Sequence, residues 1–159
     1  MILGVHHTAI STRDIQRLIG FYTGLLGFTL VHRHEWEPGA PVQNRLLGTQ
    51  GAQAQMAMLR HHNCFLELFQ FSSPDPEMRD REQRLFGAGL THIGLVVSDI
   101  RGEYARLLAA GMPFNSEPLA RPGLTAVYGR DPDGNVVELL EFHDPDQTFA
   151  PHWQMPDTV

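Results

Sequence analysis

The segment His7-Thr-Ala-Ile-Ser-Thr-Arg-Asp-Ile15 has a counterpart 85 residues later, His92-Ile-Gly-Leu-Val-Val-Ser-Asp-Ile100. Each segment begins with His, carries Asp seven residues later and ends in Ile. Two further segments match in the same way, because Glu67 and Glu138 each lie among apolar residues. Self-similarity on this scale is typical of two copies of one supersecondary unit, so the repeat decides the fold.

The first copy is predicted to fold as a strand, a helix and three more strands. Apolar positions at helical spacing follow the first strand, and Gly27 is expected to end that helix in a left-handed conformation. Ser11 or Thr12 is the expected N-cap, with Asp14 in the first turn. The strands are expected at residues 3–11, 28–34, 52–60 and 64–71.

The second copy is predicted to repeat this order from residue 90. Its helix, residues 100–110, is expected to end at Gly111. The sequence Asp131-Pro-Asp-Gly-Asn135 is a strong hairpin-turn signal before the last strand. The strands of this copy are expected at residues 90–97, 112–114, 125–130 and 135–142.

These elements predict an α+β fold of two tandem βαβββ modules, related by a pseudo-twofold axis, whose sheets form a cleft-bearing half-barrel. The modules are expected at residues 1–71 and 90–143. Residues 72–89 are a predicted linker, in which the charged stretch 77–84 is expected to form a solvated helix. Residues 144–159, rich in Pro and containing Trp153, form a predicted C-terminal tail that packs on a neighbouring element.

The two copies differ in length between their paired residues. His7 and His92 are offset by 85 positions, but Glu67 and Glu138 by 71, so the first copy is longer by 14 residues. Residues 36–51, rich in Pro and Gly, are predicted to be a long loop that holds this excess. Long insertions in compact units are more often functional than idle, and we expect this one to help cover a pocket.

Composition excludes several classes of protein. The 159 residues have a net charge of −6 and no basic stripe, so a nucleic-acid partner is not expected. All 12 basic residues are Arg, which excludes a lysine Schiff base or a lysine general base. No apolar run approaches 18 residues, so no membrane span is expected.

Cysteine usage and the N-terminus predict a cytoplasmic protein. Cys64 is the only cysteine, so no disulfide can form within the chain, and its apolar surroundings favour a buried small side chain over a reactive thiol. Residues 1–7 lack the basic region and the long apolar run of a signal peptide.

The four repeated polar residues are His7, Glu67, His92 and Glu138. An isolated His or Glu on a strand is more often an ordinary core or surface residue. Here the carboxylates lie in strongly apolar strands, where an ionised group is costly unless paired or metal-bound, although strand alternation leaves a solvent-facing position open. Two imidazoles and two carboxylates suit a divalent ion such as Zn²⁺, Ni²⁺, Co²⁺, Mn²⁺ or Fe²⁺. The seven other His residues have no counterpart in the repeat and are not expected to be ligands.

The chain resembles the vicinal oxygen chelate superfamily, the group of glyoxalases, bleomycin-resistance proteins and extradiol dioxygenases. The resemblance extends over nearly the whole chain before residue 144. It implies paired βαβββ modules, a divalent metal that chelates two neighbouring oxygens of a substrate, and a homodimer. The stretches that carry it are residues 5–10, Phe21-Tyr22, Leu26-Gly-Phe28, Phe65-Leu-Glu-Leu68, His92-Ile-Gly-Leu95 and residues 131–139.

Within this superfamily, glyoxalase I resembles the chain most closely, because its His or Gln, Glu, His, Glu ligand set is filled by His7, Glu67, His92 and Glu138. Methylmalonyl-CoA epimerase carries Gln at the position of Glu67. Extradiol dioxygenases use two His and one Glu, and antibiotic-binding members generally lack the ligands. The chain departs from glyoxalase I after Glu67, where Phe69-Gln-Phe71 replaces a polar stretch that holds glutathione.

The resemblance therefore implies a metal-dependent lyase or isomerase that moves a proton next to a carbonyl through a metal-bound enediolate, with Glu67 or Glu138 as the general base. An Fe(II) extradiol dioxygenase and a non-catalytic antibiotic-binding protein are the alternatives. The partner is expected to be a small molecule. The residues expected to bind it are Trp36, Arg45, Phe69 and Arg121, with Arg60 a further candidate for holding a substrate carboxylate.

Overall fold

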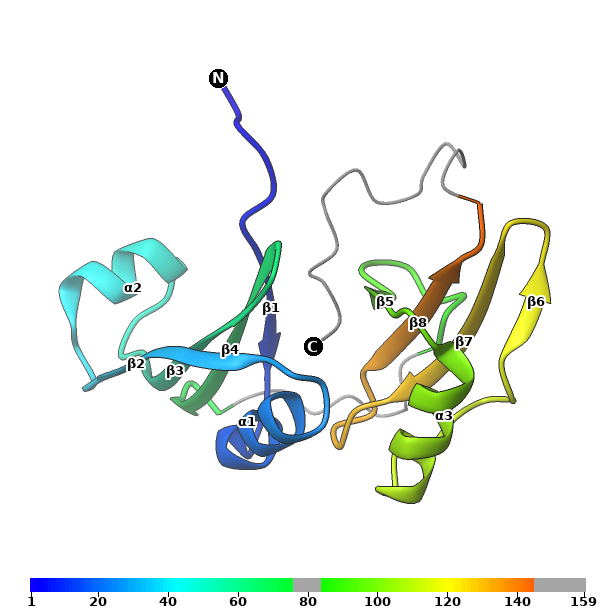
Figure 1. Cartoon of the computed structure of the whole chain (residues 1–159). Coiled ribbons are helices and arrows are strands. Elements are labelled where there is room, and N and C mark those ends of the chain that lie inside the picture. Colours follow the sequence, from blue (N-terminus) through cyan, green and yellow to red (C-terminus); the bar gives the residue numbers. More distant parts are fainter. Residues whose placement is uncertain (76–83, 145–159) are drawn as a thin grey trace. The chain divides into compact units, whose positions relative to one another are not determined.

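A computed structural model of the chain describes residues 1–75 and 84–144, and shows an α+β protein made of two βαβββ units (Figure 1). The chain divides into two compact units, residues 1–80 and 81–159, and each is described by itself. The first contains β1 (His7–Ser11), α1 (Ile15–Gly24), β2 (Thr29–Trp36), α2 (Pro41–Leu47), β3 (Gln53–His61) and β4 (Cys64–Ser73). The second contains β5 (His92–Val96), α3 (Ile100–Ala109), β6 (Leu119–Arg121), β7 (Leu124–Arg130) and β8 (Val136–Phe142).

The two sheets have the same topology, which confirms the duplicated module. Their strand orders are β1-β4-β3-β2 and β5-β8-β7-β6. In each sheet the first and last strands of the unit are parallel neighbours, and the other pairs are antiparallel. The first strand therefore lies directly beside the strand that carries the glutamate. The repeated sequence pattern thus corresponds to the same parallel strand pairing in both units.

In the first unit, one face of the sheet is covered by α1 and the other is not. The predicted helical positions Ile15, Leu18, Ile19 and Tyr22 are all buried, and α1 contacts β2, β3 and β4. Leu66 and Leu68 alternate with Glu67 along β4 and are buried on the helix side. Each such side chain contributes roughly 1.5–3 kcal/mol of burial free energy. Glu67 therefore lies on the face opposite α1.

The repeated aspartates cap the two main helices. Asp14 is the N-cap of α1 and accepts from the backbone N–H of Arg17, and Asp99 does the same for Gly102 in α3. The prediction that Ser11 or Thr12 caps α1 is wrong. The backbone N–H of Thr12 still donates to Phe69 in β4, so the strand hydrogen bonds run on and the helix begins later.

Both glycines that were expected to follow the helices have positive φ, +73° at Gly27 and +91° at Gly111. The conformation is left-handed, as predicted, and glycine adopts it without steric cost. The predicted hairpin turn before β8 is also present. Asp131 Oδ1 accepts from the backbone N–H groups of Asp133 and Asn135, which stabilises the turn between β7 and β8.

The insertion in the first unit lies where it was predicted, but it is not a plain loop. Sixteen residues, 37–52, connect β2 to β3, whereas two residues, 122–123, connect β6 to β7, a difference of 14. The connection contains α2 (Pro41–Leu47), which is followed by Gly48 in a left-handed conformation. Pro in the first turn and Gly after the last turn are favourable at these helix ends, so Pro41 and Gly48 are local signals for this helix.

Other boundaries also differ from the prediction, since β1 begins at His7 instead of residue 3 and β5 at His92 instead of residue 90. Trp36 is the last residue of β2 and not the first residue of the insertion. The strand expected at residues 112–114 is reduced to one bridge between Phe114 and Gly129, while β6 forms further along at Leu119–Arg121. Met112 is instead buried in the core. A three-residue strand carries too little alternation for its position to be predicted from sequence.

Of the helices in the described ranges, none has the length and hydropathy needed to cross a membrane. Most of the predicted linker helix, in residues 76–83, and the tail from residue 145 lie outside the residues that the structure describes.

Candidate metal-ligating site

In the first unit, His7 and Glu67 form an imidazole–carboxylate pair. Residues of β1 lie in register with β4, with His7 opposite Phe65 and Ala9 opposite Glu67. Because paired residues share a face, both side chains lie on the side away from α1. The distance between His7 Nε2 and Glu67 Oε2 is 3.2 Å. The register of one parallel strand pair is enough to bring these two residues together.

In the second unit, His92 and Glu138 repeat this arrangement. His92 lies opposite Val136 on β8, and Gly94 opposite Glu138. The distance between His92 Nε2 and Glu138 Oε2 is again 3.2 Å. The side chain of Glu138 is 12% exposed and that of Glu67 16%. Carboxylates that are this buried need a cationic or hydrogen-bonding partner.

The second ring nitrogen of each histidine is engaged by the preceding residue. Nδ1 of His92 lies 2.8 Å from Oγ1 of Thr91, and Nδ1 of His7 lies 2.9 Å from Nδ1 of His6. A partner on Nδ1 orients the ring and leaves Nε2 for a ligand, as in metal-binding histidines. If Nδ1–H donates to Thr91, the bare Nε2 faces the carboxylate. That contact is favourable only with a proton or a cation between the two.

The geometry of each pair is compatible with a divalent ion. Two donors that bind one ion at 2.0–2.2 Å with an angle near 100° are roughly 3 Å apart. The observed Nε2–Oε2 separation of 3.2 Å is close to this value. In residues 1–75 and 84–144 there is no cluster of three or more His, Cys, Asp or Glu side chains that could hold a metal. Each unit thus supplies a pair of donors of the type that suits Zn²⁺ and its neighbours.

Tyr128 distinguishes the second pair from the first, and the sequence analysis missed it. It lies on β7 opposite Glu138, and its hydroxyl group hydrogen-bonds to that carboxylate. Its ring packs edge-on against His92, with 5.5 Å between the ring centroids. The equivalent residue opposite Glu67 is Met58, whose thioether cannot donate. The turn at residues 131–135 fixes the pairing of β7 with β8. Glu138 lies two residues after Val136, so the residue two positions before Arg130, which is Tyr128, is its expected cross-strand neighbour.

Tyr128→Phe is expected to remove a tyrosine ionisation that occurs above the ordinary pKa of tyrosine. Burial first, and then the hydrogen bond and charge of Glu138, raise the pKa of Tyr128, while Arg121 lowers it to a smaller extent. A raised pKa means that the neutral hydroxyl is favoured in the folded protein. Its stabilising effect is therefore present at neutral pH and is lost as the pH rises through the folded-state pKa.

The measurement is a titration of tyrosinate absorbance in the folded protein. The control is Tyr104→Phe, since Tyr104 lies on α3 and contacts Phe114 instead of Glu138. If Tyr128→Phe removes only an ionisation at the ordinary pKa of tyrosine, the pKa of Tyr128 is not raised and its hydroxyl does not donate to Glu138.

Trp36, Phe69 and Phe71 form what we call the aromatic panel, on the face of the first sheet that carries Glu67. The rings of Phe69 and Phe71 are nearly parallel at 5.6 Å, and Trp36 packs edge-on against both, at 6.1 and 6.4 Å. Trp36 is buried, and its indole N–H has no hydrogen-bond partner among the residues that the structure describes. An unpaired buried donor typically costs about 1–3 kcal/mol. Two of the predicted substrate-binding residues are therefore in mutual contact.

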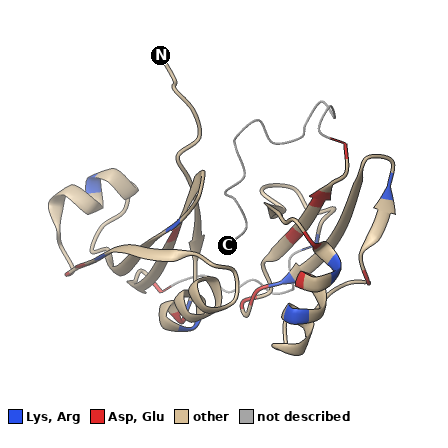
Figure 2. Cartoon of the chain, in the orientation of Figure 1, with Lys and Arg blue, Asp and Glu red and all other residues tan. Residues whose placement is uncertain are grey.

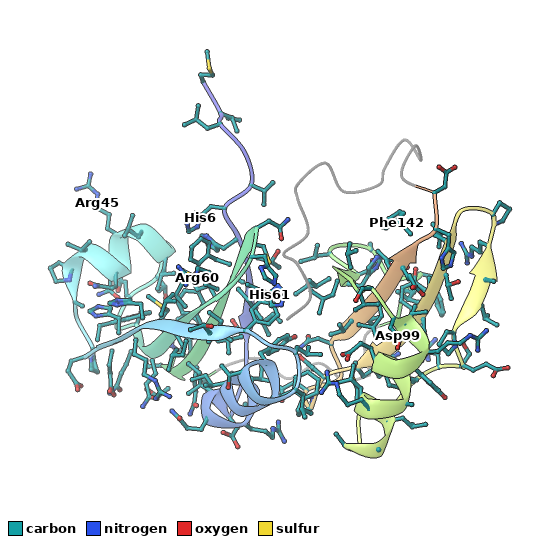
Figure 3. All side chains as sticks on the ribbon, in the orientation of Figure 1. His6, Arg45, Arg60, His61, Asp99 and Phe142 are labelled. Carbon is teal, nitrogen blue, oxygen red and sulfur yellow. The ribbon has the colours of Figure 1, made fainter. Side chains whose placement is uncertain are left out.

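The predicted arginines lie at separate places. Arg45 is in the last turn of α2, and its side chain points away from the sheet (Figure 3). Arg60 is exposed on β3, opposite Phe65. Arg121 is exposed on β6, near enough to Tyr128 for its charge to lower the pKa of the phenol. Figure 2 shows acidic residues on β8, which is separated from β6 by β7. A role for Arg45 or Arg121 in substrate binding stays a prediction.

Comparison with curated proteins finds relatives of low identity with diverse names. The chain is 31% identical to a virulence protein of Salmonella typhimurium over 143 residues, which are 87% of this chain and 83% of that protein. It is 29% identical to a lactoylglutathione lyase of Pseudomonas aeruginosa, covering 86% of this chain and 81% of that protein. It is 28% identical to a 2-epi-5-epi-valiolone epimerase of Actinomyces sp., covering 87% and 79%.

The fold and a family model agree on the relationship. A glyoxalase family protein from Bacillus cereus superimposes with a TM-score of 0.80 at 21% identity, covering 89% of this chain and 95% of that one. The family model for the Glyoxalase/Bleomycin resistance protein/Dioxygenase superfamily matches residues 4–139, a range that includes both His–Glu pairs. With the same βαβββ unit present twice, the chain belongs to the Glyoxalase/Bleomycin resistance protein/Dioxygenase superfamily.

Proposed function

We propose that this protein is a divalent-metal-dependent lyase or isomerase of the glyoxalase I-like type, acting on a small molecule as a homodimer. It would move a proton on a carbon next to a carbonyl group. The observation that carries the proposal is the His–Glu pair, found twice at equivalent strand positions with a separation of 3.2 Å. Relatives named as a lyase and as an epimerase support it.

The proposed ligands are His7, Glu67, His92 and Glu138. A bound divalent ion supplies a Lewis acid that stabilises negative charge on two adjacent substrate oxygens, an effect worth several kcal/mol in the transition state. The imidazoles contribute Nε2 donors whose orientation is fixed through Nδ1. The metal stoichiometry of the purified protein measures how many of these ligands share one ion.

We assign the general base to Glu67. Tyr128 holds the Glu138 carboxylate with a hydrogen bond, whereas the cross-strand neighbour of Glu67 is Met58. Glu67 is thus the freer of the two to accept a proton from carbon and return it. Return to the neighbouring carbon gives isomerisation, and return to the opposite face of the same carbon gives epimerisation. His7 would accompany Glu67 and keep its carboxylate oriented.

The experiment that tests this proposal is deuterium exchange in D₂O. Elemental analysis first identifies the metal in the purified protein, and 2-oxoacyl, 2-hydroxyacyl and thioester compounds are then incubated with it and followed by proton NMR. We expect loss of the signal from the hydrogen beside the carbonyl, and no loss with chelator-treated protein until the metal is restored. Equal exchange without metal contradicts the proposal. Oxygen consumption with a catechol and Fe(II) favours a dioxygenase instead.

A further inference from the structure

Glu67 and the aromatic panel follow one another along the same face of β4. Residues 67, 69 and 71 alternate with the buried helix-side residues of the strand. Successive residues on one face of a strand are about 7 Å apart, so Phe69 begins roughly one ring length beyond Glu67. A molecule whose reacting carbon lies at Glu67 and whose remainder extends along β4 in this direction meets Phe69, Phe71 and Trp36 in turn.

The panel has the geometry of a corner that accepts a flat group. Phe69 and Phe71 are inclined by only 26° to each other, and Trp36 is inclined by 78° and 82° to them. A planar ring can stack on the phenylalanines while its edge meets the indole, and both arrangements are favourable for aromatic pairs.

Among the described residues, the cross-strand neighbours of the panel carry no carboxylate or guanidinium group, and the imidazole of His34 stacks on Trp36 with 5.8 Å between the ring centroids. The cross-strand neighbours of Phe69, Phe71 and Trp36 are Met56 and Ala54. Arg60 lies opposite Phe65, on the far side of Glu67 from the panel. Arg33 is on the other face of β2, where it donates to Gln16 of α1. Figure 2 shows the strands of this sheet as largely uncharged. A substrate part that lies here is therefore apolar.

We infer, resting on the proposed function, that the substrate is a 2-oxoacyl or 2-hydroxyacyl compound bearing a planar apolar group, and that this group stacks in the panel formed by Trp36, Phe69 and Phe71. An anionic peptide moiety such as that of a glutathione adduct finds no arginine among the described cross-strand neighbours along this path. The panel is a specificity-determining site and the His–Glu pairs are the reacting site.

The test is a binding measurement that needs no turnover. Trp153→Phe leaves Trp36 as the only tryptophan, and its fluorescence is followed as 3-phenyllactate or lactate is added to the Zn²⁺-loaded protein. We expect 3-phenyllactate to bind at least about tenfold more tightly than lactate and to change the Trp36 emission. Equal affinity for the two compounds, or an unchanged emission, overturns the inference.

A matched pair of variants locates the ring. Phe71→Leu in the same background should weaken 3-phenyllactate binding several-fold and leave lactate binding unchanged. Phe65→Leu is the control, because Phe65 lies on the same strand and face but on the other side of Glu67, stacked on His6. Loss of binding in Phe65→Leu alone overturns the assignment. If Phe71→Leu fails to fold by circular dichroism, Phe69→Leu replaces it, and the comparison of the two ligands stands without either variant.

The outcomes separate this inference from the proposed function. A preference for the phenyl compound in a protein that exchanges no proton leaves the panel as a binding site and removes the enzyme proposal. Proton exchange with no preference for the phenyl compound supports the enzyme proposal and overturns the assignment of the panel as a binding site.

Discussion

Replacing Glu67 by Gln is expected to lower the rate of proton exchange beside the substrate carbonyl by about 10²–10⁴-fold, the usual contribution of a positioned general base. The amide keeps the shape of the side chain and an oxygen donor, but it cannot take up the proton. Glu138→Gln is expected to have a smaller effect on exchange, because its amide oxygen can still accept from Tyr128. The measurement is deuterium incorporation by NMR at a metal concentration that saturates each variant.

The control for both variants is Glu141→Gln. Glu141 lies on the same strand as Glu138 but on the opposite face, where its carboxylate accepts from the backbone N–H of Ile100. The Glu141→Gln variant should retain the full rate of proton exchange. Exchange that survives both Glu67→Gln and Glu138→Gln would show that neither carboxylate is the base. A larger loss in Glu138→Gln than in Glu67→Gln would reverse the roles assigned here.

Removing either repeated histidine is expected to abolish tight metal binding. His7→Ala and His92→Ala each delete an Nε2 donor that faces a mostly buried carboxylate. Loss of an outer partner of a metal ligand typically weakens binding 10–100-fold, so loss of a ligand itself should weaken it by more than about 100-fold. Competition with a chromophoric chelator measures the affinity for Zn²⁺, and exchange activity should fall in parallel.

Two further variants make this experiment specific. Thr91→Val removes the hydroxyl group beside Nδ1 of His92 and should weaken binding only about 10-fold, as an outer partner. His32→Ala removes an exposed imidazole of β2 and should change nothing. Wild-type affinity in both His7→Ala and His92→Ala would exclude these residues as ligands. A fall in affinity with His32→Ala equal to theirs would point to non-specific binding by surface histidines.

The sequence by itself determined the duplicated architecture and singled out His7, Glu67, His92 and Glu138 as repeated polar residues. Alternation along a strand, apolar spacing along a helix and the glycines after the helices are local properties, so residues such as Leu68 and Gly27 could be assigned without coordinates. The difference in spacing between the two copies also located the 14-residue insertion, because aligning one copy with the other shows where the first is longer.

Only the tertiary structure decided which neighbours these residues have. Asp14, and not Thr12, caps α1 because hydrogen bonds to another strand hold Thr12 in the sheet. Tyr128 reaches Glu138, and Trp36 reaches Phe69 and Phe71, through register across strands distant in sequence. Such contacts depend on how the backbone of one strand is aligned with the next, and no local propensity specifies that alignment.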